Sequence, residues 1–226
     1  MDMEKRLLIS TQAWTSNVIT KWRNLSGWIG GAHGKVLLFM LCLTPLFMMA
    51  WGLFTNQLGA NPIEAVTRNS GLWGLRFLLL TLCVTPLRWL TGWNVVVRFR
   101  RMLGLFAFFY ATVHMLLYLG LDQFFDWEEI WRDIVKRPFI TVGFINYIAL
   151  LPLVVTSTNG MVKRLGGRRW KLLHKLSYFV AAAACVHFLM LVKADIREPV
   201  IYIVGLIILL GARLIHSSRQ KNKAAG

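Results

Sequence analysis

Acidic side chains are scarce in this 226-residue sequence, with 10 aspartates and glutamates against 26 lysines and arginines and a formal net charge of +16. In a soluble protein, such an excess of positive charge would suggest a nucleic-acid partner. Here 56% of the residues are hydrophobic, and the charges lie between long apolar runs. Membrane topology therefore explains the basic residues better, and we expect no nucleic-acid partner.

Cysteine is also rare. Cys42, Cys83 and Cys185 each stand alone in a different apolar run, without the CxxC spacing of a redox or metal motif or the CxxCH of a covalently attached cofactor. We interpret them as buried packing residues. The first long apolar run begins only near residue 36, after a mixed polar segment, so the N-terminus is not typical of a cleaved signal peptide.

Apolar runs of about 18 or more residues dominate the chain, and each is long enough to cross a bilayer as a helix. The predicted spans are approximately 36–54, 72–90, 102–121, 139–156, 172–192 and 199–216. The sequence therefore predicts an all-α, polytopic membrane bundle of about six helices. We divide the chain into an N-terminal extension (1–35), a membrane domain (36–216) and a basic tail (217–226).

Charge asymmetry predicts the orientation. The segments 1–35, 88–101, 157–175 and 213–226 together hold 19 basic residues and two acids, whereas the segments on the other side hold six basic residues and eight acids. Because basic residues concentrate on the cytoplasmic side, both termini are expected in the cytoplasm. The outer segment 122–138 is acidic, and we interpret it either as a docking surface or as a solvated loop.

Three of the five histidines lie inside predicted spans: His114 in the third, and His174 and His187 in the fifth. His33 and His216 lie at or beyond span ends, where an interfacial role is expected. Burying an ionisable group in a bilayer costs free energy, so an intramembrane histidine suggests a functional site. With a rise of about 1.5 Å per residue, His114 lies roughly 18 Å and His187 roughly 22 Å from the inner edge. His174 lies only about 3 Å in. The pair at a common depth is therefore His114 with His187.

Two opposed neutral imidazoles from neighbouring helices can supply both axial ligands of a haem iron, and ligation offsets the cost of burying them. Small residues line the helix faces that lead to both histidines: Gly104, Ala107 and Ala111 before His114, and Ala183 and Ala184 before His187. They leave room for a flat macrocycle, but they equally allow close helix packing. A histidine that only hydrogen-bonds a neighbouring helix is the simpler alternative.

The position of His174 does not fit the same site. Thirteen residues separate it from His187, which leaves the two side chains roughly 140° apart on an ideal helix. Arg100 and Arg101, rather than another histidine, lie at its level. Either the helix is irregular or the two histidines serve different sites. A second haem would need another ligand, and a flavin or quinone head group is an equal alternative.

Four stretches of the sequence resemble the MsrQ (YedZ) family, the haem-binding membrane subunits of the MsrPQ methionine sulfoxide reductase system within the ferric-reductase-like transmembrane group. They are NPIEAVTRNSGLWGLRFLLLTLCVTPLR, RFRRMLGLFAFFYATVHMLLYL, KRPFITVGF and LVVTSTNGMVKRLGGRRWKLLHKLSYFVAAAACVHF. The resemblance covers about residues 36–216. The preceding 1–35 look longer than the family usually has.

The resemblance implies one or two b-type haems ligated by His114, His174 and His187, together with FMN. It also implies a location in the bacterial inner membrane and a periplasmic molybdopterin partner, MsrP, that reduces methionine sulfoxide in oxidised proteins. The electrons would come from the quinone pool or from a cytosolic flavin reductase. The similar core of NADPH oxidases carries two histidines on each of two helices. The 102–121 span has only one, which departs from the pattern for a second haem.

The function that we expect is electron transfer across the membrane. A haem with both axial positions filled suits electron relay rather than oxygen chemistry. About ten residues follow the last span, which leaves no room for a nucleotide-binding domain, so we expect both the donor and the final catalyst on other proteins. The alternatives are a stand-alone ferric or quinone reductase-type cytochrome b, and a non-redox membrane metal-handling protein that uses the histidines as soft-metal ligands.

Overall fold

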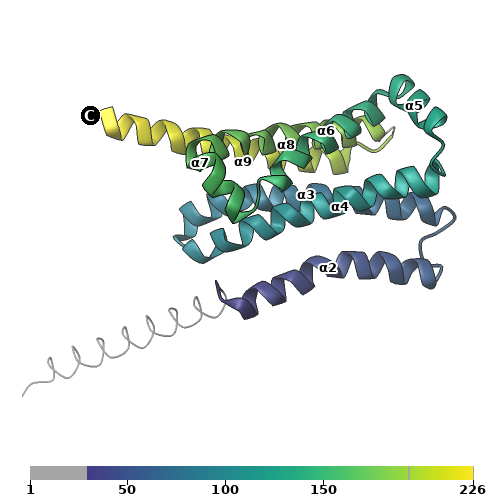
Figure 1. The fold of residues 1–226 in the computed structure, drawn as a ribbon, viewed down its shortest axis with the longest axis horizontal. Coiled ribbons are helices and arrows are strands. Elements are labelled where there is room, and N and C mark those ends of the chain that lie inside the picture. Colours follow the sequence, from purple (N-terminus) through teal and green to yellow (C-terminus); the bar gives the residue numbers. More distant parts are fainter. Residues whose placement is uncertain (1–29, 193, 226) are drawn as a thin grey trace, which may run out of the picture.

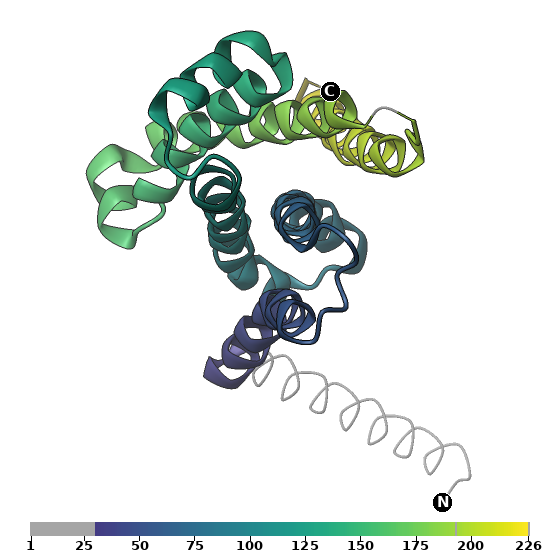
Figure 2. The same ribbon diagram turned by 90° about the vertical axis from the view of Figure 1, so that its right-hand side faces the viewer.

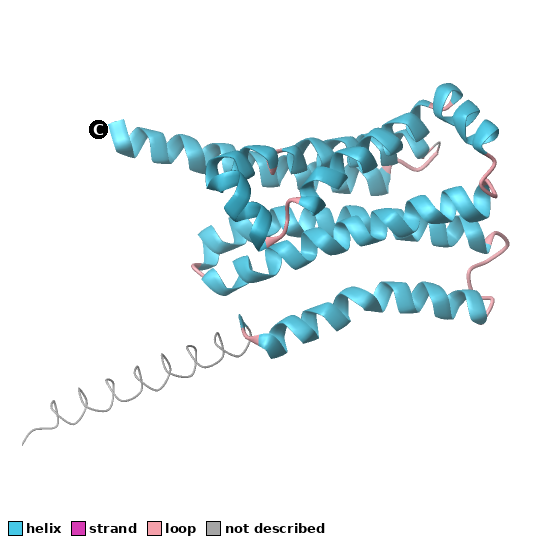
Figure 3. Cartoon of the chain, in the orientation of Figure 1, coloured by secondary structure: helices cyan, strands magenta, loops and turns pink. Residues whose placement is uncertain are grey.

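A computed structural model describes residues 30–192 and 194–225, and this part of the chain is helical, with turns and short loops and no strand (Figure 3). The predicted N-terminal extension lies almost wholly outside the described residues. In chain order, the elements are α2 (Ala32–Phe54), α3 (Pro62–Thr91), η1 (Asn94–Phe99), α4 (Arg100–Leu117), the π-helical turn η2 (Tyr118–Asp122), α5 (Trp127–Lys136), α6 (Pro138–Val155), α7 (Asn159–Leu173), α8 (Leu176–Leu191) and α9 (Arg197–Ala225).

Five helical segments of the described chain are long and apolar enough to cross a membrane: α2, α3, α4 with its flanking turns, α6 and α9. The consecutive helices α7 and α8, bent by 42° at a short break, pass the same test as a pair and make a sixth. The prediction of a polytopic helical protein with about six spans is therefore confirmed. The fifth span is the one that is not a continuous helix.

The helices form an up-and-down bundle. Helices α3 and α4 pack closely together, α6 packs on α8, and α9 lies beside α8 and α3. Helix α2 covers the opposite side of the α3–α4 pair (Figures 1 and 2). The basic turn between α3 and α4, helix α7 and the end of α9 lie at one end of the bundle, and α5 lies at the other (Figure 1). This grouping of basic segments is what the predicted topology requires.

Helix α3 begins at Pro62, well before the predicted start near residue 72. The Asn61 side chain caps it by accepting a hydrogen bond from the Glu64 amide at 3.3 Å, and proline is well suited to the first helical turn. The sequence predicted a loop over 55–71, a segment with Asn, Gly and Pro and only two charges. The early start matters because it brings the backbone of Thr67 onto a regular helix beside α4.

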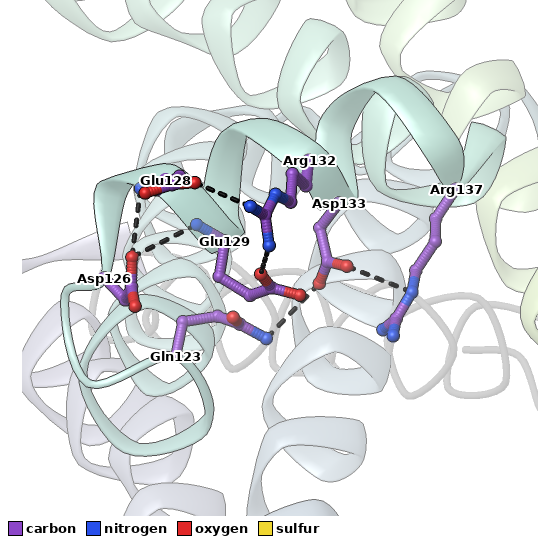
Figure 4. A network of polar contacts seen from close by, with 7 residues as sticks. All are labelled: Gln123, Asp126, Glu128, Glu129, Arg132, Asp133 and Arg137. Atoms are coloured by element: carbon purple, nitrogen blue, oxygen red, sulfur yellow. Dashed lines mark hydrogen bonds and ion pairs between the residues drawn. The ribbon is translucent and has the colours of Figure 1, made fainter.

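The segment 122–138 is not an open loop, because it contains helix α5. Asp126 caps the helix by accepting hydrogen bonds from the amides of Glu128 and Glu129 at 3.0 and 3.1 Å. The side chains of both glutamates pair with Arg132 at 2.6 and 3.2 Å. Most of the acids predicted to form a docking surface or a solvated loop are therefore engaged within the chain, as Figure 4 shows.

Two arginines within the spans are partnered by neighbouring helices. Arg76 on α3 donates from Nε to the Tyr202 hydroxyl on α9 at 2.8 Å. Arg213 on α9 donates to the Tyr178 hydroxyl at 3.0 Å and to the backbone carbonyl of Leu82. Charged groups at such depths are tolerated when they face the bundle and find partners. These bonds tie α9 to α3 and α8.

The outermost helix, α2, is attached to the bundle at its proline. Pro45 has no N–H with which to continue the helical hydrogen-bond ladder. The fully buried Tyr110 of α4 fills this position, where its hydroxyl donates to the Cys42 carbonyl at 2.8 Å and accepts from the Leu46 amide at 3.0 Å. One phenol thus satisfies backbone groups on both sides of the proline.

We expect Tyr110→Phe to destabilise the protein by about 1–3 kcal/mol, because the substitution removes the partner of two backbone groups in an apolar setting. The measurement is thermal unfolding in detergent. Tyr147→Phe is the matched control. The Tyr147 hydroxyl forms a hydrogen bond with the Thr112 side chain at 3.2 Å, and among the described residues it bonds no backbone group. Adding Pro45→Ala to Tyr110→Phe should restore part of the loss by letting α2 close its own ladder. Equal midpoints for Tyr110→Phe and the unmodified protein would contradict this account.

Candidate functional site

A cavity of about 1350 Å³ lies between α3, α4, α6 and α8. The residues that line it include several small ones and two imidazoles: Gly71, Ala107, Ala111, His114, Gly143, Ala184 and His187. Sites for drug-sized ligands commonly occupy about 300–1,000 Å³. This cavity therefore has room for a large, flat group.

The structure brings His114 and His187 together across this cavity. Their ring centres are 6.2 Å apart, and their planes are inclined by 79°. An imidazole nitrogen binds a metal at about 2.0 Å and lies about 1.1 Å from its ring centre, so two imidazoles on opposite sides of one metal have centres about 6 Å apart. The observed spacing therefore fits a single metal held between the two rings.

Each ring is oriented by a backbone carbonyl on a neighbouring helix. His114 Nδ1 donates to the Thr67 carbonyl of α3 at 2.7 Å, and His187 Nδ1 donates to the Phe139 carbonyl of α6 at 2.7 Å. A carbonyl can only accept, so Nδ1 carries the proton in both rings. In a neutral imidazole, this leaves the Nε2 lone pair free to bind a metal, and the outer-shell bond raises its basicity.

A glycine makes space for each ring. A Cβ atom built on Gly71 would lie 3.0 Å from the His114 ring, and one built on Gly143 would lie 3.0 Å from the His187 ring. Gly71 is four residues after Thr67, and Gly143 is four residues after Phe139. Residues four apart share one helix face. The same arrangement of an accepting carbonyl followed by a glycine therefore occurs twice.

Sequence reasoning found the two histidines but missed these glycines and carbonyls. A backbone carbonyl has no sequence signature, and a glycine inside an apolar span reads as a packing residue. The available signal was a glycine in the first half of each of two apolar helices, Gly71 in α3 and Gly143 in α6. It becomes interpretable only when the helices are placed beside α4 and α8.

The stripe of small residues before His114 serves both purposes that the sequence left open. Ala107 and Ala111 line the cavity, and they also lie against Gly74 of α3, where a Cβ would come within 3.4 Å of the Ala111 amide nitrogen. Gly104 instead faces Thr81 at an ordinary contact distance. The small residues thus allow close packing of α4 on α3, and Ala107 and Ala111 also leave space for the cavity beside His114.

His174 lies away from this pair, at the break between α7 and α8. Its ring stacks on Trp170 with 3.8 Å between centres, and its Nδ1 lies 3.1 Å from the Trp170 carbonyl. Nε2 is buried, and the ring also interacts with the backbone of Leu153. Arg100 is near enough to interact with it electrostatically. The broken helix, rather than rotation along an ideal one, therefore sets the direction in which His174 points.

The other two histidines and the three cysteines have simpler surroundings. His216 stacks on Trp89 with 3.9 Å between ring centres, near the end of the bundle, and His33 is exposed. Cys42 and Cys185 are buried and all three cysteines are free, which agrees with a packing role.

The chain is similar to known membrane proteins. Residues 70–185 match the family described as the ferric reductase like transmembrane component. The chain is 52% identical over 188 residues to the protein-methionine-sulfoxide reductase heme-binding subunit MsrQ of Rhodospirillum rubrum, an alignment that covers 83% of this chain and 90% of that protein. It is 50% identical over 194 residues to the subunit of the same name from Herminiimonas arsenicoxydans, covering 84% and 89% of the two chains.

We expect Gly71→Ala and Gly143→Ala to weaken the binding of an added metalloporphyrin by up to about tenfold each, because a methyl group at 3.0 Å forces the imidazole off its preferred rotamer. The measurement is the dissociation constant from absorbance titration of the apoprotein. Gly205→Ala is the control, since a Cβ there meets nothing within 4 Å. Unchanged binding in both site variants would show that the ring positions do not matter for the ligand.

Proposed function

The chain belongs to the MsrQ family of ferric-reductase-like transmembrane components, and from this premise we propose that it is a haem-binding electron-transfer subunit of a protein-methionine-sulfoxide reductase system. The single observation that carries the proposal is the pair of opposed imidazoles, 6.2 Å apart between ring centres, at a large cavity. The reduction of methionine sulfoxide itself belongs to a partner protein in this proposal.

The cofactor proposed for this site is haem b, with Nε2 of His114 and Nε2 of His187 as the axial ligands of its iron. The orientation of both rings by 2.7 Å bonds from Nδ1 supports this assignment. When bound, haem supplies reversible one-electron chemistry, and two axial histidines favour electron relay over oxygen binding. The chain itself holds the two rings in place through the Thr67 and Phe139 carbonyls.

The alternative of a bare metal ion finds less support. Among the described residues, no three histidine, cysteine, aspartate or glutamate side chains converge in a way that could hold a metal ion. Protein sites for zinc or copper commonly need at least three such ligands. A porphyrin brings its own equatorial nitrogens, so two histidines suffice. The described chain therefore suits a metalloporphyrin better than a transported ion.

We propose a separate role for His174 at the other end of the bundle. Its position at the break between α7 and α8, near Arg100, supports a role separate from that of the His114–His187 pair. The neighbouring Arg100 would favour an anionic group there. A second haem, FMN and a quinone head group all fit this description, and in each case the site would receive electrons before the His114–His187 haem does.

The electron path that we propose runs across the bacterial inner membrane, outward from the cytoplasmic side. The grouping of the basic segments at one end of the bundle supports a cytoplasmic location for that end (Figure 1). The donor is then the quinone pool or a cytosolic flavin reductase, and the acceptor is a periplasmic molybdopterin enzyme of the MsrP type. A stand-alone ferric or quinone reductase of the same architecture is the second candidate, favoured by the match to ferric-reductase-like components.

We expect His114→Ala and His187→Ala to lose nearly all bound haem, because each removes an axial ligand, whereas His174→Ala should have a partial effect. The measurement is haem per protein from the pyridine haemochrome spectrum of purified material. His216→Ala is the control, since its ring stacks on Trp89 at the edge of the bundle. Full haem retention in His114→Ala would remove the ligand assignment.

The choice between a subunit and a stand-alone reductase is tested in proteoliposomes. We expect the dithionite-reduced protein to be reoxidised by a methionine sulfoxide protein only when the molybdopterin partner is present. Reoxidation is followed by loss of the sharp α band of reduced b-type haem. Rapid reoxidation by ferric citrate alone, with no effect of the partner, would favour the stand-alone reductase.

A further inference from the structure

We propose that Arg68 and Arg137 bind the two propionate carboxylates of the haem and thereby fix its orientation, with its acidic edge toward the α5 end of the cavity. The inference rests on the proposed haem site between His114 and His187. It adds an anion-binding function for two residues that neither the histidine geometry nor the family comparison assigns.

The position of the two arginines is the first observation. Both line the cavity, and among its described lining residues they are the only cations. Arg68 directly follows Thr67, and Arg137 lies two residues before Phe139, so each arginine adjoins the carbonyl that orients one imidazole. The two cations thus come from different helices and line the same cavity.

Both arginines lie on the same side of the histidine level. Gly71 contacts the His114 ring, and Arg68 is three residues, or about 4.5 Å of helix rise, nearer the start of α3. Gly143 contacts the His187 ring, and Arg137 is six residues, or about 9 Å, nearer the start of α6. Both helices start at the α5 end of the bundle (Figure 1). The cations are therefore displaced from the iron position toward one edge of a macrocycle.

Arg137 is held in place by an ion pair with the buried Asp133. Its Nε lies 3.1 Å from Oδ1 of Asp133, whose side chain is only 6% exposed. The other oxygen of Asp133 accepts from the Tyr118 hydroxyl at 3.1 Å. It also accepts from Gln123 at 3.3 Å (Figure 4). A guanidinium presents five donors in a planar fork, so a bond at Nε leaves the terminal nitrogens available for a second carboxylate. The Arg137 side chain is still 54% exposed.

Arg68 has a looser support. Its Nη2 lies 3.4 Å from Glu198, and both side chains are about half exposed. Such an exposed pair contributes little by itself and exchanges easily for a partner inside the cavity. The acids Glu64, Asp122 and Asp195 also line this end and would repel a carboxylate elsewhere along the rim. The propionates are thereby directed to the two arginines.

The opposite end of the cavity is apolar, with Leu78, Leu150 and Val180 among its lining residues. Haem has one edge with two carboxylates and three edges without them. Burying a carboxylate against aliphatic side chains is costly, whereas pairing it with a guanidinium is favourable. The cavity therefore accepts haem in one orientation. The arginines also neutralise the negative charge of the propionates, which would otherwise stabilise the ferric state.

The test compares Arg68→Gln, Arg137→Gln and the double variant with Arg132→Gln. Arg132 forms ion pairs at 2.6 and 3.2 Å on α5 and does not line the cavity, so it is the matched control. We expect the two site variants to bind haem about 10- to 100-fold more weakly, the range for a lost charge-assisted hydrogen bond. Their reduction potentials should shift to more negative values in spectroelectrochemical titration, and the Arg132→Gln potential should not move.

A second measurement does not depend on the folding of the variants. Haem dimethyl ester, which lacks the propionate charges, is titrated into the unmodified apoprotein. We expect it to bind more weakly than haem, and we expect Arg68→Gln to cause no further loss with the ester. Equal affinity of the unmodified protein for ester and haem, or an unchanged potential in the double variant, would overturn the anchor while leaving the histidine ligands in place. Haem retention in His114→Ala would overturn the haem site itself, and the anchor with it.

Discussion

The constraint on which the site depends is that two imidazoles inside a membrane must be neutral, fixed in one tautomer and aimed at each other. Burial between apolar helices favours the neutral form, and the Nδ1 bonds to the carbonyls of Thr67 and Phe139 fix the tautomer, since a proton on Nδ1 of a neutral ring leaves Nε2 as the free lone pair. Gly71 and Gly143 meet the third, because any side chain there would enter the space of the ring. Histidines, carbonyls and glycines form one unit, and it is present twice.

The rest of the bundle holds the helices of this unit together through partnered polar groups. Tyr110 joins α2 to α4 at the point where Pro45 interrupts the backbone ladder. Arg76 and Arg213 fasten α9 to the other side of α3. Because the acceptor of the His114 bond lies on α3, whatever fixes α3 also fixes the ring. The buried Asp133 gives the α5 end of the bundle a polar anchor, and its partner Arg137 lines the cavity.

The architecture was largely predictable, because spans of membrane length and a strong charge asymmetry are properties of composition. The common depth of His114 and His187 followed from counting helical rise, and the structure places their rings 6.2 Å apart. Other features depended on contacts between segments distant in the sequence. The early start of α3 at Pro62, helix α5 within 122–138 and the break beside His174 arise from caps and turns in polar segments that hydropathy reads as loops. The accepting carbonyls carry no side-chain signature at all.

The most direct test of the central claim is the electron paramagnetic resonance spectrum of the oxidised protein at low temperature. Two axial imidazoles inclined by 79° predict the highly anisotropic low-spin ferric signal that near-perpendicular histidine planes produce. His187→Ala should lose this signal, because the substitution removes one of the two imidazoles. A high-spin signal from the purified protein, or an unchanged low-spin signal in His187→Ala, would contradict the account.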